Sequence, residues 1–142
     1  MKKVLFFEDD KIYSEKITSV VNSSHGFVID CVSNLRNFGK KVSNEYDLCI
    51  IDYDLQETSG DRVIKTLNDI YPQLSVTLIS HRKVLNDYSK HDFENFVKFI
   101  VKPDRHLQLV EEVKDILQEI DEDQKGKLPG YDEVLDDFVD VK

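Results

Sequence analysis

The chain is poor in the residues that mark several classes of protein. Its 142 residues include two cysteines, three prolines, five glycines and no tryptophan. The two cysteines, Cys31 and Cys49, are too few for a disulfide framework, and their spacing matches no zinc-binding pattern. Because both lie in apolar, strand-like runs, we expect buried, reduced thiols that pack as small hydrophobic groups.

Long apolar runs are also lacking. Met1, Lys2 and Lys3 are followed by only four apolar residues before three acids, a pattern that argues against a secretory signal. No stretch approaches the roughly 20 apolar residues of a membrane-spanning helix. We therefore expect a cytoplasmic protein that does not engage the membrane.

An excess of basic residues is lacking as well. The chain has 19 Lys and Arg residues against 28 Asp and Glu residues, which gives a net charge of −9. Residues 1–110 are nearly balanced, with 16 acids and 15 bases, whereas residues 111–142 hold 12 acids and 4 bases. This distribution argues against direct nucleic-acid binding. The acidic end either aids solubility, which its composition favours, or meets a basic partner.

Short apolar segments that alternate with amphipathic segments dominate the rest of the sequence. We expect strands at residues 4–7, 27–32, 48–51, 74–79 and 96–101. Apolar residues recur at helical spacing between and after them, most weakly at residues 84–88, and predict five helices. Continuous apolar strands alternating with such helices indicate a doubly wound α/β domain with a parallel sheet covered on both faces.

The C-terminal end follows a different pattern. Residues 121–130 are polar with two glycines and a proline and are interpreted as a linker. Apolar residues at 131, 134, 135 and 138 then predict a short amphipathic helix, which is too short to be stable without a packing partner. We accordingly divide the chain into a folded domain, residues 1–122, and an acidic linker with an amphipathic tail, residues 123–142.

Four of the expected strands end in polar side chains. Glu8 and Asp9 follow the first strand, Asp52 the third, Ser80 the fourth and Lys102 the fifth. In an open α/β sheet, ligands bind just outside the carboxyl ends of the strands, so these groups are expected to share one pocket. Carboxylates, a hydroxyl and an ammonium suit a divalent cation together with a phosphoryl group. A carboxylate in such a pocket can also act as a nucleophile and form an aspartyl-phosphate.

The order and spacing of these residues resemble the receiver domain of bacterial two-component response regulators. The resemblance covers about residues 2–121 and rests on the following segments: Val4-Leu5-Phe6-Phe7-Glu8-Asp9-Asp10, Tyr46-Asp47-Leu48-Cys49-Ile50-Ile51-Asp52, Ser59-Gly60, Ser80 and Lys102-Pro103. It implies a flavodoxin-like (βα)5 fold, with five parallel strands in the order 2-1-3-4-5 and a short helical tail added at the C-terminus.

The resemblance also implies a role for each pocket residue. Asp52 resembles the phospho-acceptor. Mg²⁺ is the implied cofactor, held by Glu8, Asp9, Asp52 and the backbone carbonyl of Asp54. Lys102 and Ser80 resemble the lysine and the switch hydroxyl of the family, and Phe99 occupies the position of its switch aromatic residue.

The sequence departs from the family pattern beside the pocket. Gln56 stands where proline is usual, which is expected to loosen the loop after Asp52. His81 stands where a small residue is usual, and either narrows access to the acceptor or hydrogen-bonds the phosphoryl group. We hypothesise that Asp54 and Arg82, beside His81, tune the lifetime of the phosphate.

The expected function is a phosphorylatable receiver in a two-component or phosphorelay system, and not an enzyme in the usual sense, although it would catalyse its own phosphorylation and dephosphorylation. The expected partners are a histidine kinase or phosphotransfer protein and a downstream protein target, with a homodimer left open. Only about 20 residues follow the last expected helix of the domain, too few for a DNA-binding domain. Output is therefore expected to run through protein contacts or phosphorelay.

Two alternatives stay open at this point. Gln56 and His81 are compatible with a receiver-like binding module that works without phosphorylation. Asp52-Tyr53-Asp54 also resembles the Asp-x-Asp motif of haloacid-dehalogenase-type phosphatases, which form an aspartyl-phosphate with Mg²⁺. That motif normally lies on the first strand, whereas here it follows the third and no cap domain is evident.

Overall fold

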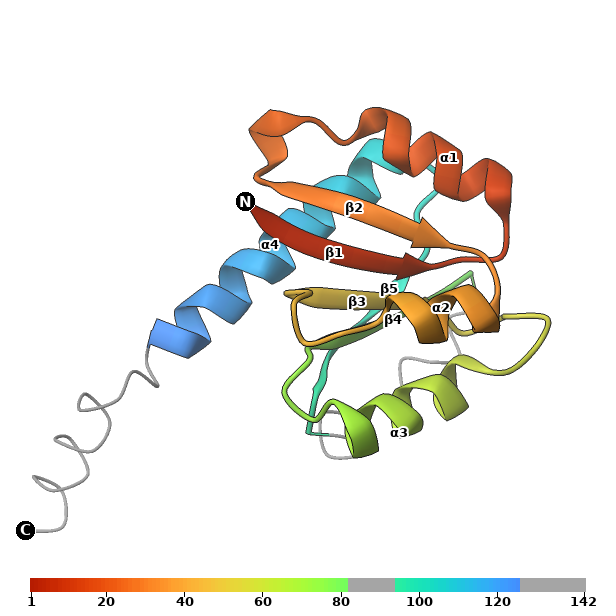
Figure 1. Cartoon of the computed structure of the whole chain (residues 1–142). Helices are drawn as coiled ribbons and strands as arrows, with labels where there is room; N and C mark the ends of the chain where they lie inside the picture. The colour runs from red at the N-terminus through yellow and green to blue at the C-terminus, as the bar shows by residue number, and fades with distance from the viewer. Residues whose placement is uncertain (82–93, 126–142) are drawn as a thin grey trace, which may run out of the picture.

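The computed structural model describes residues 1–81 and 94–125, and the structural statements below concern these residues. Its five strands form one parallel sheet in the order β2-β1-β3-β4-β5 (Figure 1). The strands are β1 (Lys2–Phe7), β2 (Phe27–Val32), β3 (Leu48–Asp52), β4 (Val76–Ser80) and β5 (Phe96–Val101). The predicted fold class and strand order are confirmed.

Helices cover both faces of this sheet (Figure 1). They are α1 (Lys11–Val20), α2 (Leu35–Lys41), α3 (Gly60–Ile70) and α4 (His106–Lys125), with a short 3-10 helix η1 (Ser23–His25) before β2. Side chains of α1 and α4 pack on one face, and those of α2 and α3 pack on the other. The sheet therefore lies between two separate hydrophobic cores.

Strand β1 shows how one short segment serves both cores. Its last four residues are almost fully buried, with Val4 and Phe6 in the core beneath α1 and α4, and Leu5 and Phe7 in the core beneath α2 and α3. Successive side chains of a strand point to opposite faces of the sheet. The part of a strand that is covered on both sides is therefore continuously apolar, as the sequence predicted for residues 4–7.

Side-chain caps fix the start of three helices near the carboxyl edge of the sheet. Asp10 accepts hydrogen bonds from the backbone N–H groups of Ile12 and Tyr13 at the start of α1. Asn34 and Ser59 cap α2 and α3 in the same way. Such caps satisfy N–H groups that have no partner within the helix, so the chain turns from strand to helix at a defined residue.

Some element bounds differ from the sequence-based expectation. Strand β1 begins two residues earlier and β4 two residues later than expected. Helix α4 runs to Lys125, so residues 121–125, which were expected to belong to a linker, are helical. No glycine or proline interrupts the helical sequence before residue 126, and polar residues alone do not end a helix. The expected helices at residues 84–88 and 131–138 lie outside the described residues.

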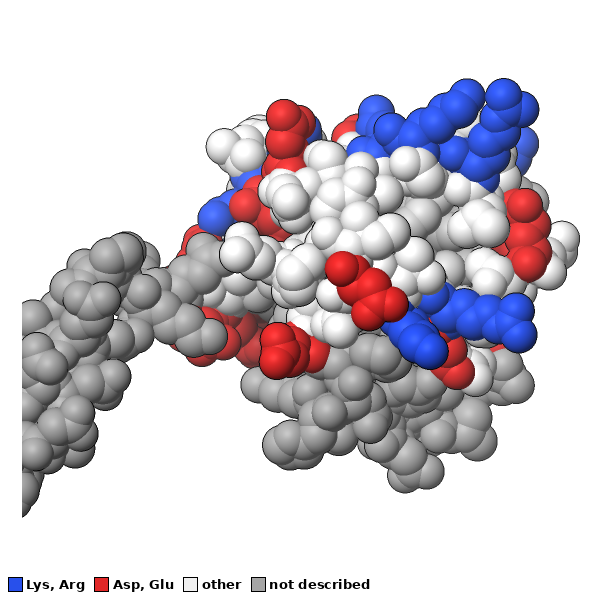
Figure 2. Space-filling model, turned by 60° about the horizontal axis from the view of Figure 1, so that its bottom comes forward, with Lys and Arg blue, Asp and Glu red and all other residues white. Residues whose placement is uncertain are grey.

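The described surface carries charges of both signs. On the face in Figure 2, lysine and arginine side chains lie in separate groups with acidic and uncharged side chains between them. Within residues 1–81 and 94–125, no helix is long and apolar enough to cross a membrane. The described cysteines are free thiols, with Cys49 buried as expected and Cys31 only partly buried.

Gly60 provides a test of the packing beneath the carboxyl edge. A Cβ atom at this position would lie 2.7 Å from Tyr53 Cα and 3.0 Å from the Asp52 carbonyl oxygen. Gly60→Ala should therefore lower the free energy of unfolding by about 1–3 kcal/mol, measured by urea denaturation. Gly39→Ala is the matched control: a Cβ there meets nothing within 4 Å, and alanine should stabilise α2 by up to ~1 kcal/mol. Equal stabilities of the two variants would contradict the close contact at Gly60.

Candidate functional site

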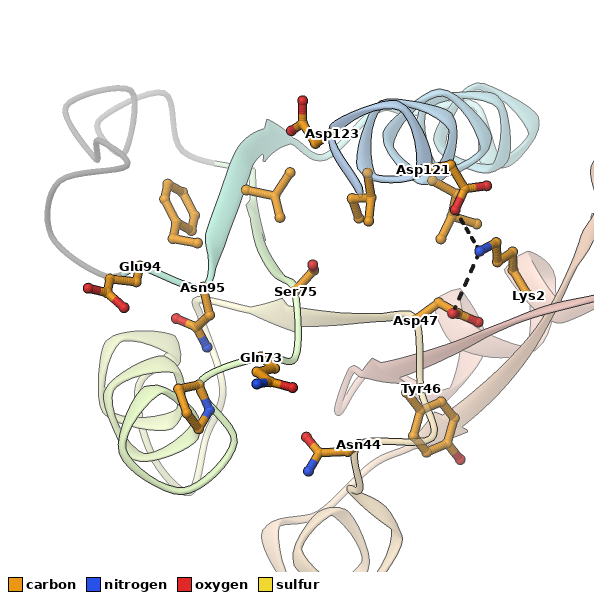
Figure 3. A pocket seen from close by; sticks show the side chains of 15 residues that line it. Lys2, Asn44, Tyr46, Asp47, Gln73, Ser75, Glu94, Asn95, Asp121 and Asp123 are labelled. Carbon is orange, nitrogen blue, oxygen red and sulfur yellow. Dashed lines mark hydrogen bonds and ion pairs between the residues drawn. The ribbon is translucent and has the colours of Figure 1, made fainter. Parts of the chain in front are cut away.

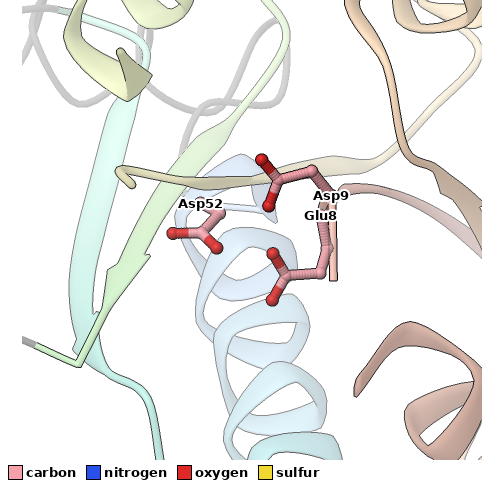
Figure 4. A group of neighbouring side chains, drawn as sticks. All are labelled: Glu8, Asp9 and Asp52. Carbon is pink, nitrogen blue, oxygen red and sulfur yellow. The ribbon is translucent and has the colours of Figure 1, made fainter. Parts of the chain in front are cut away.

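Three carboxyl groups meet at the carboxyl edge of the sheet (Figure 4). Glu8 and Asp9 directly follow β1, and Asp52 is the last residue of β3. Because β1 and β3 are adjacent parallel strands, with Phe7 opposite Ile51, their ends lie side by side. One carboxylate oxygen from each of the three acids lies within 4.8 Å of the others. The structure thus brings together the acids that the sequence analysis placed in one pocket.

An ammonium group completes this cluster. Lys102 directly follows β5, and its backbone N–H donates a hydrogen bond of 2.7 Å to the carbonyl oxygen of Ser80. Its side chain is buried, and Nζ forms an ion pair with Glu8 and lies 3.5 Å from Asp52 Oδ2. One lysine therefore contacts acids from two different strands.

The acids are not fully compensated by this lysine. Glu8 is completely buried, and burial, followed by its interaction with Asp52, raises the pKa of its carboxyl group from 4.5 to about 8, while Lys102 acts in the opposite direction. Among the described residues, Glu8 Oε2 has no hydrogen-bond partner. When ionised, three carboxylates exceed one ammonium in charge, and a buried unpaired oxygen is costly. This donor set fits a hard divalent cation such as Mg²⁺, which prefers carboxylate oxygens.

The loop after β3 is tied to the acids through its backbone. The N–H of Asp54 donates to Asp52 Oδ1 at 2.8 Å, and the N–H of Gln56 donates to Asp9 Oδ2 at 2.8 Å. Proline at position 56 would have no N–H to donate. The residue expected to loosen this loop therefore supplies a hydrogen bond between the loop and the acidic cluster.

Ser80 lies at the end of β4, next to Asp52 on the neighbouring strand. It is fully buried, and its hydroxyl donates a 2.7 Å hydrogen bond to Asp54 Oδ2. The structure therefore places Ser80 and Asp54 together at the edge of the acidic cluster. His81 follows as an exposed residue, whereas Arg82 lies outside the described residues.

Phe99 lies in β5, partly buried against the core beneath α2 and α3. The resemblance assigned it to the switch position, which stays a prediction, and the structure places it on β5, the strand that pairs with β4. Sequence reasoning missed Tyr13, whose ring centroid lies 4.1 Å from Lys102 Nζ. Nothing in the local pattern of α1 reveals this contact, because Lys102 lies far along the chain, directly after β5.

A cavity lies at the opposite, amino-terminal edge of the sheet (Figure 3). Its volume is about 680 Å³, and its lining includes Lys2, Asp47, Asn95 and Asp121. Lys2 Nζ lies 2.6 Å from Asp121 and 3.9 Å from Asp47, so these two acids already have a cationic partner. The carboxyl edge, with its excess of negative charge, is therefore the stronger candidate for a functional site.

Fold and site together define a doubly wound α/β protein with an acidic site at the carboxyl edge of its sheet. The model of the response regulator receiver domain family matches residues 4–114, and the chain belongs to this family. Receiver domains are generally signalling domains rather than classical enzymes; they interact with histidine kinases and downstream effectors, and some form dimers.

Individual relatives are more distant. The transcriptional regulatory protein CusR of Escherichia coli K12 is 25% identical over 117 residues, which cover 82% of this chain and 51% of CusR. The chain thus spans about half the length of the curated relatives that it matches.

Two solved structures show the same fold. A CheY-like receiver domain protein from Methanospirillum hungatei JF-1 has a TM-score of 0.71 and 18% identity, covering 87% of this chain and 98% of its own. The response regulator TrrA from Thermotoga maritima, solved in complex with Mg²⁺-BeF, has a TM-score of 0.61 and 23% identity, covering 82% of this chain and 99% of its own.

The raised pKa of Glu8 predicts a pH dependence of stability in the absence of divalent cations. Between pH 4.5 and about 8, the folded chain retains a proton on Glu8 that the unfolded chain has released. The folded state then binds more protons, so stability should fall as pH rises through this window, by at most about 1.4 kcal/mol per pH unit. Urea denaturation in a metal chelator should show this fall in the parent and a flatter profile in Glu8→Gln.

Glu15→Gln removes an exposed glutamate from α1 and serves as the control. It should keep the slope of the parent. Parallel profiles for the parent and Glu8→Gln would contradict the assignment.

Proposed function

We propose that this chain is a receiver switched by Mg²⁺-dependent phosphorylation of Asp52. The proposal rests on one observation: Asp52 lies close to two further acids and to the Lys102 ammonium at one edge of the sheet. Membership of the receiver family supports the same reading. The Mg²⁺-BeF complex belongs to TrrA, whose fold this chain shares.

In this proposal, the side chains of Glu8, Asp9 and Asp52 and the backbone carbonyl of Asp54 hold Mg²⁺. When bound, the cation neutralises charge on the carboxylates and on the oxygens of the phosphoryl group. The Asp52 carboxylate attacks phosphorus, the acyl-phosphate bond forms and the bond to the donor breaks. The donor's leaving group departs with its electron pair: the imidazole of a phosphohistidine, or acetate from acetyl phosphate.

Lys102 and Ser80 then have roles that follow from their positions. The buried ammonium of Lys102 is close enough to Asp52 to stabilise charge on a transferred phosphoryl oxygen. Ser80 exchanges its hydrogen bond with Asp54 for one with the phosphoryl group, and Phe99 turns further inward. These two shifts bias the neighbouring surface between two arrangements. The partners are a histidine kinase or phosphotransfer protein upstream and a protein target downstream.

Among the acids, Asp52 alone should accept the phosphoryl group. Incubation with acetyl phosphate and Mg²⁺ should add one phosphoryl group to the parent, seen by intact-protein mass spectrometry as an adduct released at alkaline pH. Asp52→Asn should abolish the adduct, whereas Asp69→Asn, which changes an exposed acid of α3, should retain it. A parent that gains no adduct would favour the phosphorylation-independent binding module.

The lifetime of the phosphoryl adduct tests which residues control its hydrolysis. We propose that Asp54, His81 and Arg82 set this lifetime, since Asp54 contacts Ser80 and His81 follows it directly. The same assay, followed over time, should show different decay rates for Asp54→Asn and the parent. Equal rates would remove Asp54 from this role.

The metal site can be tested with two neighbouring acids. Mg²⁺ should raise the melting temperature of the parent, and Asp9→Asn should weaken its apparent affinity by about tenfold or more because a cluster carboxylate is lost. Asp10→Asn is the matched control, because Asp10 caps α1 and asparagine is an equally good cap. Equal effects of the two substitutions would refute a site built on Asp9.

A further inference from the structure

The ring of Tyr13 lies against the ammonium group of Lys102. Tyr13 is in the first turn of α1, and its ring centroid is 4.1 Å from Lys102 Nζ. Both residues are largely buried, with 9% and 7% of their surfaces exposed. A cation close to the face of an aromatic ring is attracted by the electron density of that face, and this attraction is strongest where water is excluded.

Tyr13 is itself held in place from several directions. Its backbone N–H donates to the capping carboxylate of Asp10, and its phenolic hydroxyl donates to the carbonyl oxygen of Pro103 at 3.4 Å. Its ring packs 4.9 Å from that of His106 and 6.4 Å, edge to face, from that of Phe6. The ring thus connects α1, β1 and the segment after β5, and the fold fixes its position before any ligand arrives.

The other partners of Lys102 are also the proposed partners of the cation. In the structure, the ammonium contacts Glu8 and Asp52. A divalent cation on these carboxylates repels the ammonium and weakens its attraction to them. The neutral ring is not subject to this competition. Burial and the negative charges of Glu8 and Asp52 raise the pKa of the Tyr13 phenol, which keeps the ring neutral.

We infer that Tyr13 is a positioning residue for Lys102, holding the ammonium beside Asp52 when a cation occupies the acidic cluster. This inference rests on the proposed function of the site. It makes Tyr13 necessary for fast phosphoryl transfer although the residue touches neither the phosphoryl group nor the metal. The part of the side chain that matters is the face of the ring, and the hydroxyl contributes mainly through its contact with Pro103.

Nuclear magnetic resonance tests the contact without any phosphorylation. The Cε protons of Lys102 should show an upfield ring-current shift in the parent, and the shift should persist when Mg²⁺ is added. Tyr13→Phe should retain the shift and Tyr13→Leu should lose it. Loss of this upfield shift when Mg²⁺ binds to the parent would show that Lys102 has moved away from the ring, and would overturn the inference. This measurement uses the parent protein, so it does not depend on whether a variant folds.

The rate of phosphorylation tests whether this positioning of Lys102 speeds the reaction. With acetyl phosphate and saturating Mg²⁺, Tyr13→Leu should slow phosphorylation about tenfold, the size expected of a buried cation–aromatic contact, with the Mg²⁺ affinity unchanged. Tyr13→Phe should react like the parent. In a Lys102→Met background, Tyr13→Leu should have no further effect, because the ring would have no ammonium to hold.

The outcomes separate this inference from the proposed function. A parent that gains no phosphoryl group defeats the proposed function, whatever the resonance data show. A parent that reacts while Tyr13→Leu reacts equally fast defeats the inference alone. Tyr13→Phe slowed as much as Tyr13→Leu would assign the effect to the hydroxyl and its contact with Pro103, and would likewise overturn it.

Discussion

The structure depends on one electrostatic constraint: two buried carboxylates, Glu8 and Asp52, share the single ammonium of Lys102. Burying charge is costly unless each group has a partner, and here the acids outnumber the base. The pairing of β1 with β3, of β3 with β4 and of β4 with β5 brings these groups together. The fold thus maintains an excess of negative charge at one edge of the sheet, and that excess favours a divalent cation.

The groups around this cluster form a connected unit. Backbone N–H groups of the loop after β3 reach both Asp52 and Asp9, and Asp54 in the same loop accepts a hydrogen bond from Ser80. A change of charge at Asp52 would therefore alter the hydrogen bonds of both the loop and the end of β4. Tyr13 adds a contact of another kind, because its ring attracts Lys102 without carrying a charge of its own.

Much of the fold followed from local patterns. Strands β1 and β3 are apolar where both of their faces are covered, at residues 4–7 and 48–51, and this pattern can be read from the sequence. Helix ends were less predictable: α4 continues through polar residues to Lys125 because neither glycine nor proline stops it earlier. The site acids were predictable because parallel strands place their carboxyl ends at one edge.

The sequence by itself determined which chemical groups stand at the strand ends: two acids after β1, one at the end of β3, a hydroxyl and a lysine. Only the tertiary structure decided how they are paired. Gln56 was expected to loosen the loop after β3, but in the structure its backbone N–H donates a hydrogen bond to Asp9. The tertiary structure also places Tyr13 beside Lys102. The physical reason is distance. Such contacts act over a few ångströms between residues far apart in the chain, and packing between elements sets those separations.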